Sequence, residues 1–396
     1  MSLLLRSRLE TMLGLRRGPS SRTMSRPAPS RSHGPGRSTK KDTQIETATT
    51  ELTRLPGLEV PETETGLKRA NWLEHTPRKR LMVVAGSSHP ELAARISEQL
   101  GVDLGQREIS TFADGTTYVR FSESVRGADM FIVQTAASDV DHHLMELLIM
   151  INAAKLASAK RITAVIPWYF YARQDKKSRP REPITARLVA DMLETAGVDR
   201  VLTMDLHAGQ VQGFFNNPVD HMTAVPMFAQ HVRDLLGDDE PRVAVAPDTG
   251  RAKLAGKFGE MIGGDLVVLN KERPAHNVAR VTDVIGDVAG KTAVMTDDII
   301  DTAGTLCAGA QALKAAGATR VIACATHALF NGDALDRIRD SVFDRVIVTD
   351  TVPINPLTRP DNVEVLSVSG ILAETIHNVF SDDSVSAIFA GENQLF

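Results

Sequence analysis

The stretch from residue 291 to 306, KTAVMTDDIIDTAGTL, constrains the fold more than any other part of the chain. Its apolar run at 292–295 predicts a buried strand of a parallel sheet, and the small residues at 302–305 predict a tight turn. We expect a helix from Leu306, with apolar residues at i, i+4 and i+7 and Gly317 as its end. Strand, small-residue turn and helix in this order point free backbone N–H groups and the positive end of the helix dipole at the turn, which suits a phosphate.

Three carboxylates accompany this turn, since Asp297, Asp298 and Asp301 lie between the apolar run and the small residues. Neighbouring carboxylates can accept hydrogen bonds from sugar hydroxyls, or they can hold a metal ion. An acidic strand end without a ligand is the alternative interpretation. Beside a phosphate-binding turn, the carboxylates favour a phosphorylated sugar as the ligand.

The composition is that of a globular protein and argues against several classes. The 396 residues suffice for two or three domains, with 42% hydrophobic and 24% charged residues. The net charge of −4 gives no general affinity for nucleic acid, and no apolar run approaches the roughly 20 residues that span a membrane. Cys307 and Cys324 stand in apolar surroundings without metal or redox spacing, so we expect buried thiols in a reducing compartment, the cytoplasm.

The first 80 residues differ from the rest of the chain. Residues 1–41 hold eight Arg and two Lys against one Glu, a charge of +9, so the remaining chain carries −13. Residues 42–80 are polar and contain three prolines, and we expect 1–80 to be a disordered basic head and linker. Three interpretations of the head stay open. It is a tail or the result of a start codon placed too far upstream, an organelle transit peptide, or a basic anchor for a partner.

Apolar strand-like runs alternate with amphipathic helical segments from Leu81 onward. This alternation predicts an α/β fold with mostly parallel sheets. The strands form two series with a similar layout, so we interpret the chain as two doubly wound domains that divide near residues 215–225. The expected parts are an N-terminal domain at 81–222, a second domain at 223–373, and a segment at 374–396 that packs back on the N-terminal domain.

Polar residues cluster immediately after the predicted strands of both series. These segments are DLH from 205, PDTG from 247, NKERP from 270 and TDDIID from 296. Because ligands of open α/β sheets bind beyond the carboxyl ends of the strands, we expect the two domains to present one shared cleft.

Residues 294–306 resemble the ribose-phosphate loop of the phosphoribosyltransferase superfamily, in which two acids precede a D-T-[AG]-G-T turn. The resemblance implies that Asp297 and Asp298 meet the hydroxyls of a ribose. It also implies that the turn holds the 5-phosphate, and the residues of the turn are Asp301, Thr302, Ala303, Gly304 and Thr305.

Further segments narrow the resemblance to one family, the ribose-phosphate pyrophosphokinases (phosphoribosyl pyrophosphate synthetases). The similar segments are WYFYARQDKKSRPREPIT from 168, MDLHAGQVQGFF from 204, FADG from 112, HLMELLIMI from 143 and SVSAIF from 384. The resemblance covers nearly all of residues 81–396 and implies two domains of phosphoribosyltransferase type. A phosphoribosyltransferase that acts on a base is a competing enzyme class, but such an enzyme does not need the FADG and RQD segments.

The resemblance implies transfer of the pyrophosphoryl group of Mg-ATP to the C1 hydroxyl of ribose 5-phosphate. The products would be phosphoribosyl pyrophosphate and AMP, for nucleotide and amino-acid biosynthesis. The C1 hydroxyl attacks the β-phosphorus in line, and no covalent enzyme intermediate is required. The sequence also contains no G-x-x-x-x-G-K-[ST] segment.

The ATP site of the family carries over to six residues of this chain. They are Phe112, Asp114, Gly115, Thr116, Arg173 and Gln174. An aromatic ring can stack on adenine, and the guanidinium fork of arginine matches a polyphosphate. The family usually has a glutamate at the position of Thr116, so the resemblance leaves open which contact Thr116 makes.

His207 and Asp248 match the magnesium-associated positions of the family. Magnesium prefers oxygen ligands and keeps water, so we expect His207 to act through water or on phosphate. The run PDTGRAK around Asp248 is shorter and poorer in glycine than that of the family. We therefore expect the local pyrophosphate loop to differ in shape.

Lys271 and Arg273 match the flexible catalytic loop of the family, and Arg273 is also expected to contact ribose 5-phosphate. Two cations suit the transfer of a diphosphoryl group, because negative charge shifts onto bridging and equatorial oxygens. A solvated basic pair without function is the alternative. Glu272 and Ala275 occupy positions that are basic in many relatives, which leaves rate and nucleotide affinity open.

A non-catalytic regulatory paralogue is a further hypothesis, but such a chain would be expected to lose the cation loop or the ribose loop, and both are present. The resemblance implies a homo-hexamer built from dimers, with inorganic phosphate and ADP as allosteric ligands. Arg126, Ser384 and Ser386 fall in segments that resemble parts of that allosteric site. No nucleic-acid or membrane partner is expected, and the response to phosphate and ADP stays open.

Overall fold

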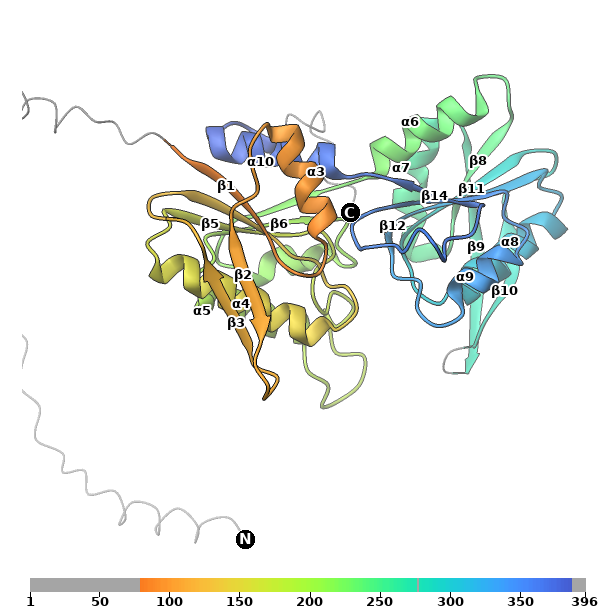
Figure 1. Cartoon of the computed structure of the whole chain (residues 1–396). Helices are drawn as coiled ribbons and strands as arrows, with labels where there is room; N and C mark the ends of the chain where they lie inside the picture. Colours follow the sequence, from red (N-terminus) through yellow and green to blue (C-terminus); the bar gives the residue numbers. More distant parts are fainter. Residues whose placement is uncertain (1–78, 276–277, 387–396) are drawn as a thin grey trace, which may run out of the picture. The chain divides into compact units, whose positions relative to one another are not determined.

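The computed structural model describes residues 79–275 and 278–386 (Figure 1). Residues 1–78 lie outside the described residues. The predicted head and linker at 1–80 is therefore described only at Lys79 and Arg80. None of the helices in the described residues is both long enough and apolar enough to cross a membrane.

The first half of the described chain builds a five-stranded parallel sheet of order β1-β4-β5-β6-β7 (Figure 1). Its strands are β1 Leu81–Ala85, β4 Asp129–Val133, β5 Arg161–Ile166, β6 Arg200–Met204 and β7 Val219–Met222. The helices along this part are α3 Pro90–Leu100, α4 Val140–Leu156 and α5 Thr185–Ala196. A separate antiparallel hairpin is formed by β2 Arg107–Thr111 and β3 Thr117–Phe121.

Both faces of this sheet are buried, which explains why its strands are continuous apolar runs. In β1, Val83 and Ala85 pack into the same cluster as the helix α3, whereas Met82 and Val84 pack into the cluster of α4 and α5. Successive residues of a strand point to opposite faces, so one short strand serves two layers of helices.

The second half builds a seven-stranded sheet of order β10-β9-β8-β11-β12-β13-β14. Its strands are β8 Arg242–Ala246, β9 Asp265–Ala275, β10 Val278–Ile285, β11 Thr292–Ile300, β12 Arg320–Ala328, β13 Arg345–Thr349 and β14 Val363–Leu366. The helices are α6 Val225–Leu236, α7 Ala252–Ile262, α8 Gly304–Ala315, α9 Ala334–Arg339 and α10 Ser369–Ser381, with the short 3-10 helix η2 Thr249–Arg251. A second 3-10 helix, η1 Gly209–Phe214, lies in the first half between β6 and β7. All pairs are parallel except β9 with β10. The predicted α/β class with mostly parallel, doubly wound sheets is confirmed.

The segment NKERP departs from the expectation of a loop after a strand at 266–269. The strand β9 continues through Ala275 and pairs antiparallel with β10, in a register that places Lys271 opposite Val281. Pairing with β10 explains the longer strand, because Asn270, Lys271, Glu272 and Ala275 each have a partner in a register that is interrupted at two places. The apolar run at 292–295 likewise begins a longer strand, since β11 extends to Ile300.

The last helix, α10, lies beside α3 of the first half (Figure 1). The side-chain amide of Gln99 on α3 donates to the hydroxyl oxygen of Ser369 at 2.9 Å. Residues of α10 also join the cluster on one face of β1. We keep the domain boundaries near residues 222 and 373 as a proposal.

Candidate active site

The acidic pair Asp297 and Asp298 lies in the second half of β11, at the carboxyl end of the sheet where ligands of such folds bind. The backbone N–H of Asp298 donates to Oδ1 of Asp297 at 2.9 Å. The two side chains differ in exposure, with 27% of Asp297 and 6% of Asp298 accessible to solvent. The pair therefore has one inward and one outward carboxylate.

Two side chains from other segments reach the buried carboxylate of Asp298, the His207 ring and the Arg251 guanidinium. Nδ1 of His207, in the turn after β6, lies 2.7 Å from its Oδ2. Arg251, at the end of η2, places Nη2 at 2.6 Å from the same oxygen and Nε at 3.7 Å from Oδ1 of Asp297. His207 comes from the five-stranded half and Arg251 from the seven-stranded half, so the two halves meet at Asp298.

Burial and charge push the pKa values of the two carboxyls apart. Burial and then the charge of Asp298 raise the pKa of Asp297 well above its ordinary value of 3.8. Burial also acts to raise the pKa of Asp298, but the His207 hydrogen bond and the Arg251 charge outweigh it and hold that pKa below its ordinary value. Asp298 therefore carries the negative charge of the pair, and Asp297 takes up a proton more readily.

The predicted phosphate turn links β11 to α8. Ala303 adopts the left-handed conformation with φ of 59° immediately before the helix begins at Gly304. The N–H groups of the first helical turn have no carbonyl partner within the helix, so they are available to an anion. A Cβ built at Gly304 would meet nothing nearer than Arg337 Nη1 at 3.9 Å, so the space over the helix start is open.

Neighbouring segments hold the other groups of this turn. The backbone N–H of Asn331 donates to the carbonyl oxygen of Asp301 at 2.9 Å, and its side-chain amide donates to Oδ1 of Asp301 at 2.8 Å. Arg337 Nη1 donates to the carbonyl of Thr302 at 2.7 Å. With its carbonyl and carboxylate groups held by these donors, the turn presents N–H groups to the open side.

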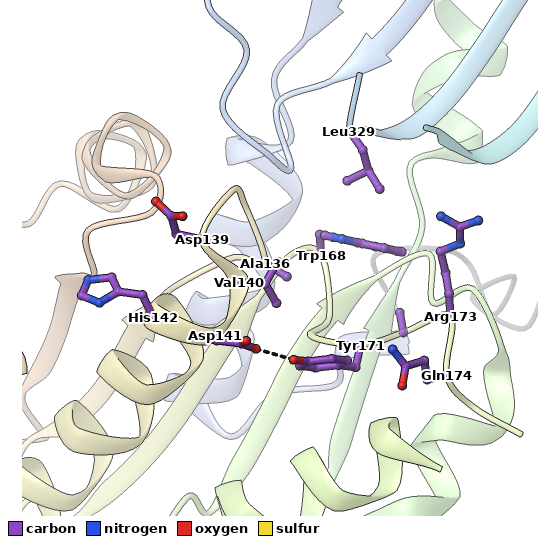
Figure 2. Close-up of a pocket in the computed structure, with 11 residues that line it drawn as sticks. Ala136, Asp139, Val140, Asp141, His142, Trp168, Tyr171, Arg173, Gln174 and Leu329 are labelled. Atoms are coloured by element: carbon purple, nitrogen blue, oxygen red, sulfur yellow. Dashed lines mark hydrogen bonds between the residues drawn. The ribbon is translucent and has the colours of Figure 1, made fainter. Parts of the chain in front are cut away.

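Arg173 joins the phosphate turn to a separate cavity. Its Nη1 lies 2.5 Å from Oδ2 of Asp301. Arg173 also lines a cavity of about 770 Å³. The lining residues are Ala136, Asp139, Val140, Asp141, His142, Trp168, Tyr171, Ala172, Arg173, Gln174 and Leu329. Figure 2 shows Asp139 and His142 at one end of the cavity and Arg173 at the other.

The walls of the cavity combine rings with polar groups. The Tyr171 hydroxyl donates to the carboxylate of Asp141 (Figure 2), and Trp168 lies in the buried wall. Gln174 accepts from the hydroxyl of Thr185 at 2.5 Å, which fixes its side chain. A flat apolar wall with an arginine at one end suits a planar base attached to phosphates.

The other predicted ATP residues lie outside the lining of this cavity, on the β2–β3 hairpin. Phe112 is exposed, and its ring meets Tyr118 edge to face at a centroid distance of 5.7 Å. Oδ1 of Asp114 accepts from the backbone N–H of Thr116 at 3.0 Å and from its hydroxyl at 2.7 Å. Gly115 has φ of 88°, a conformation that favours glycine. The structure thus divides the six predicted ATP residues into two groups.

Models of two families match the chain. The N-terminal domain of ribose phosphate pyrophosphokinase matches residues 81–197, and the phosphoribosyl synthetase-associated domain matches residues 243–390. A ribose-phosphate pyrophosphokinase of Caldanaerobacter subterraneus is 48% identical over 310 residues, which cover 78% of this chain and 98% of that protein. The chain belongs to the ribose-phosphate pyrophosphokinase family. It is an enzyme of the ribose-phosphate diphosphokinase class, and its product is phosphoribosyl pyrophosphate.

Other relatives agree in sequence and in fold. A ribose-phosphate pyrophosphokinase of Clostridium acetobutylicum is 46% identical over 314 residues, covering 79% of this chain and 98% of its own. The crystal structure of phosphoribosylpyrophosphate synthetase from Mycobacterium smegmatis superimposes with a TM-score of 0.72 at 45% identity. It covers 77% of this chain and 100% of its own. The similar region therefore leaves out about a fifth of this chain.

The predicted metal and catalytic residues of this pyrophosphokinase-family chain have separate surroundings. Asp248 caps η2, where its Oδ1 accepts from the N–H of Gly250 at 3.0 Å, whereas His207 bonds Asp298. Lys271 and Arg273 lie in β9, and for this part of the strand we describe only the backbone pairing. The roles of all these residues stay predictions.

Sequence reasoning missed Arg251, Asn331 and Trp168 as residues of this family member's site. Arg251 was visible only as one of the two basic residues of PDTGRAK, and nothing in the segment indicated its carboxylate partner. The strand order supplies that signal, because β8 pairs with β11 and places the turn after β8 beside the acidic pair. Asn331 and Trp168 reach the site through contacts that depend on the assembled fold.

Proposed function

We propose that this enzyme transfers the pyrophosphoryl group of Mg-ATP to the C1 hydroxyl of ribose 5-phosphate, yielding phosphoribosyl pyrophosphate and AMP. The observation that carries the proposal is the ion pair between Arg173 and Asp301, at 2.5 Å. This ion pair connects the cavity wall, which suits a nucleotide, with the turn, which suits a sugar phosphate. Two substrates held there would meet at the junction of the two halves, as a transfer between them requires.

The ribose 5-phosphate half of the site is the acidic pair with the turn after it. The carboxylates of Asp297 and Asp298 would accept hydrogen bonds from the ribose hydroxyls. The open start of α8 would receive the 5-phosphate with the N–H groups of the turn. The residues assigned to the phosphate are Asp301, Thr302, Ala303, Gly304 and Thr305, with Arg273 as an additional contact.

The nucleotide half of the site is the cavity beside Arg173. Its rings would hold the adenine, and Arg173 with Gln174 would bind the phosphate chain. We assign Phe112, Asp114, Gly115 and Thr116 to the same ligand through the exposed hairpin that carries them. This hairpin does not contribute to the lining of the cavity.

Magnesium would supply charge neutralisation on the phosphate oxygens. Within residues 79–275 and 278–386, no group of three or more His, Cys, Asp or Glu side chains is arranged to hold a metal ion. This fits magnesium, which uses one or two protein carboxylates together with substrate phosphates and water. We assign Asp248 and His207 to the ion that accompanies the nucleotide.

Lys271 and Arg273 would stabilise the charge that develops during the transfer. Cations aimed at the bridging and equatorial oxygens act more strongly in the transition state than in the ground state. Both residues lie on β9, which pairs antiparallel with the edge strand β10, so the ribbon at one end of the sheet carries them. We further propose a cytoplasmic homo-hexamer that serves nucleotide and amino-acid biosynthesis, with phosphate and ADP as regulatory ligands.

The test is a coupled assay on the purified full-length chain. Protein, magnesium, ATP and ribose 5-phosphate are mixed, and AMP and phosphoribosyl pyrophosphate are measured with and without added inorganic phosphate. We expect both products in equal amounts and a requirement for all three components. Absence of AMP under both conditions would overturn the proposal and favour a regulatory subunit. Formation of AMP without ribose 5-phosphate would show ATP hydrolysis instead of transfer.

A further inference from the structure

The guanidinium of Arg251 lies against both carboxylates of the acidic pair. Nη2 is 2.6 Å from Oδ2 of Asp298, and Nε is 3.7 Å from Oδ1 of Asp297. Only 15% of the Arg251 side chain is exposed, so the ion pair with Asp298 is largely shielded from solvent. The position is one that a cation bound by two adjacent carboxylates would otherwise take.

The turn that carries Arg251 is held in place by its own backbone. Asp248 Oδ1 accepts from the N–H of Gly250, and the N–H of Arg251 donates to the carbonyl of Asp248 at 3.2 Å. The strand β8 before the turn pairs in parallel with β11, from Thr292 to Met295. Arg251 therefore starts from the strand next to the acidic pair and reaches the pair with its fork pre-positioned.

Arg251 offsets part of the negative charge of the acidic pair. Two neighbouring carboxylates repel each other, and the guanidinium lies within 3.7 Å of both. His207 adds a hydrogen bond to Asp298 from the other side, so that carboxylate already has two partners. Asp297 is the more exposed of the two, and its Oδ1 accepts from the N–H of Asp298 at 2.9 Å and has the longer contact to Arg251.

We propose that Arg251 is a built-in counter-cation of the acidic pair, which takes the place of a divalent ion at Asp298 and leaves Asp297 as the carboxylate that receives the ribose hydroxyls, so that the assignment of both carboxylates to the ribose narrows to Asp297. Arg251 is thus a positioning residue, because it acts on the ligand through the two carboxylates. The role of Asp297 toward ribose rests on the proposed function, whereas the role of Arg251 as a counter-cation does not.

The two carboxylates therefore have different roles. Asp298 serves as the anchor for His207 and Arg251 and holds the two halves together at the site. Asp297 serves the ligand. Consequently, magnesium is needed for the phosphates of the nucleotide but not for neutralising the acidic pair.

The experiment measures thermal unfolding of the full-length chain against magnesium concentration, without substrates. The variants are wild type, Arg251→Gln and Arg251→Lys. We expect Arg251→Gln to gain a magnesium-dependent rise in Tm of about 3 °C at roughly 10 mM, the scale for an ion with a Kd near 1 mM. Wild type and Arg251→Lys should lack that rise, because a side-chain cation still occupies the place.

Two controls separate this site from other effects of charge. Lys253→Gln removes one positive charge from the exposed side of the same segment and should gain no magnesium dependence. The double variant Arg251→Gln with Asp298→Asn should lose the gain, because one carboxylate of the vacated place is absent. Sodium chloride at matched ionic strength should reproduce none of the rise.

An equal rise in wild type, or no rise in Arg251→Gln, overturns the proposal. If Arg251→Gln is unfolded without magnesium, its circular dichroism is followed through the same titration, and lack of recovery is the contrary result. The measurement needs no catalysis, so it stands even if the coupled assay contradicts the proposed function. A steady-state comparison then tests the role toward ribose, with Asp297→Asn expected to raise the KM for ribose 5-phosphate at least tenfold. An unchanged KM in that variant would remove Asp297 from the sugar.

Discussion

His327 of β12 is hydrogen-bonded to the backbone carbonyl of Asp205, the residue that follows β6. Its Nε2 lies 3.1 Å from that oxygen and 3.2 Å from the carbonyl of Met204. Carbonyl oxygens only accept, so Nε2 carries the proton and donates to them. The seven-stranded sheet is thereby bonded to the turn that carries His207.

The other side of the His327 ring is equally well held. Nδ1 lies 2.9 Å from the hydroxyl of Thr351, and the ring lies against Trp168 at a centroid distance of 4.4 Å. With the proton on Nε2 of the neutral ring, Nδ1 is an acceptor for the Thr351 hydroxyl, whose oxygen also lies 3.0 Å from the Thr326 carbonyl oxygen. Because Trp168 also lines the cavity, this one buried ring contacts the cavity wall and the turn before His207.

Replacing His327 should therefore reduce both stability and turnover. We expect His327→Leu to lower the free energy of unfolding by about 2–3 kcal/mol, because buried carbonyls lose their donor. We expect kcat to fall about tenfold or more through displacement of the His207 turn. His327→Gln, which can still donate to the carbonyls, should recover part of both. Denaturant unfolding and the coupled assay measure the two effects.

The matched control is Ile322→Val, in the same strand and fully buried. It should lose about 1 kcal/mol and leave kcat unchanged. A normal kcat in a folded His327→Leu would show that the ring stabilises the fold without positioning the site.

The lowered pKa of His221 predicts how the free energy of unfolding depends on pH. Its Nε2 accepts from the N–H of Leu206 at 2.8 Å, and burial lowers its pKa from 6.5 to about 4, with Asp205 opposing and His327 reinforcing the shift. Between pH 6.5 and 4 the unfolded chain binds a proton at this residue that the folded chain does not bind. Stability is therefore lost as pH falls through that window, by up to about 3 kcal/mol.

The measurement for His221 is the denaturant midpoint at pH 7, 5.5 and 4.5. His221→Gln should show a shallower decline than wild type across that range, whereas replacement of the exposed His377 by Gln should decline as wild type does. Parallel curves for wild type and His221→Gln would contradict the assignment.

The sequence predicted the elements of the fold well and their partners poorly. The phosphate turn between β11 and α8 was predicted because it is local, being encoded in one strand, one small-residue turn and one helix. The pairing of β9 with β10 was not predicted, because NKERP is too polar to show the periodicity of a strand. A ladder to a neighbouring strand overrode that local preference.

Contacts between distant residues explain what the sequence could not predict at the site. Arg251 and Asp298 meet because β8 and β11 are neighbours, and the chain leaves β8 for β9 and β10 before it returns. His207 and Asp298 are 91 residues apart in sequence. A sequence motif identifies each residue from its neighbours along the chain. These pairs depend instead on the spatial order of the strands in the folded sheets.

Asp301 should matter most for binding ribose 5-phosphate. Its side chain is held by Asn331 at 2.8 Å and by Arg173 at 2.5 Å, so it fixes the turn that faces the open start of α8. We expect Asp301→Ala to raise the KM for ribose 5-phosphate about tenfold or more, with a smaller effect on the KM for ATP. Asp336→Ala, an exposed carboxylate that pairs with Arg339, is the control and should leave both KM values unchanged. Equal KM values in Asp301→Ala and wild type would remove Asp301 from the phosphate turn's function.

Lys271 tests whether the edge ribbon of the second sheet takes part in the chemistry. If its ammonium stabilises charge that develops on the transferred group, its loss should act on the transition state more than on substrate binding. We therefore expect Lys271→Ala to lower kcat by roughly 10²-fold or more and to change both KM values little. Lys160→Ala, which removes an exposed lysine that follows α4, is the matched control and should keep wild-type kcat. Near-normal turnover in Lys271→Ala would assign the lysine to a solvated edge of the β9–β10 ribbon, whereas raised KM values with an unchanged kcat would make it a binding residue only.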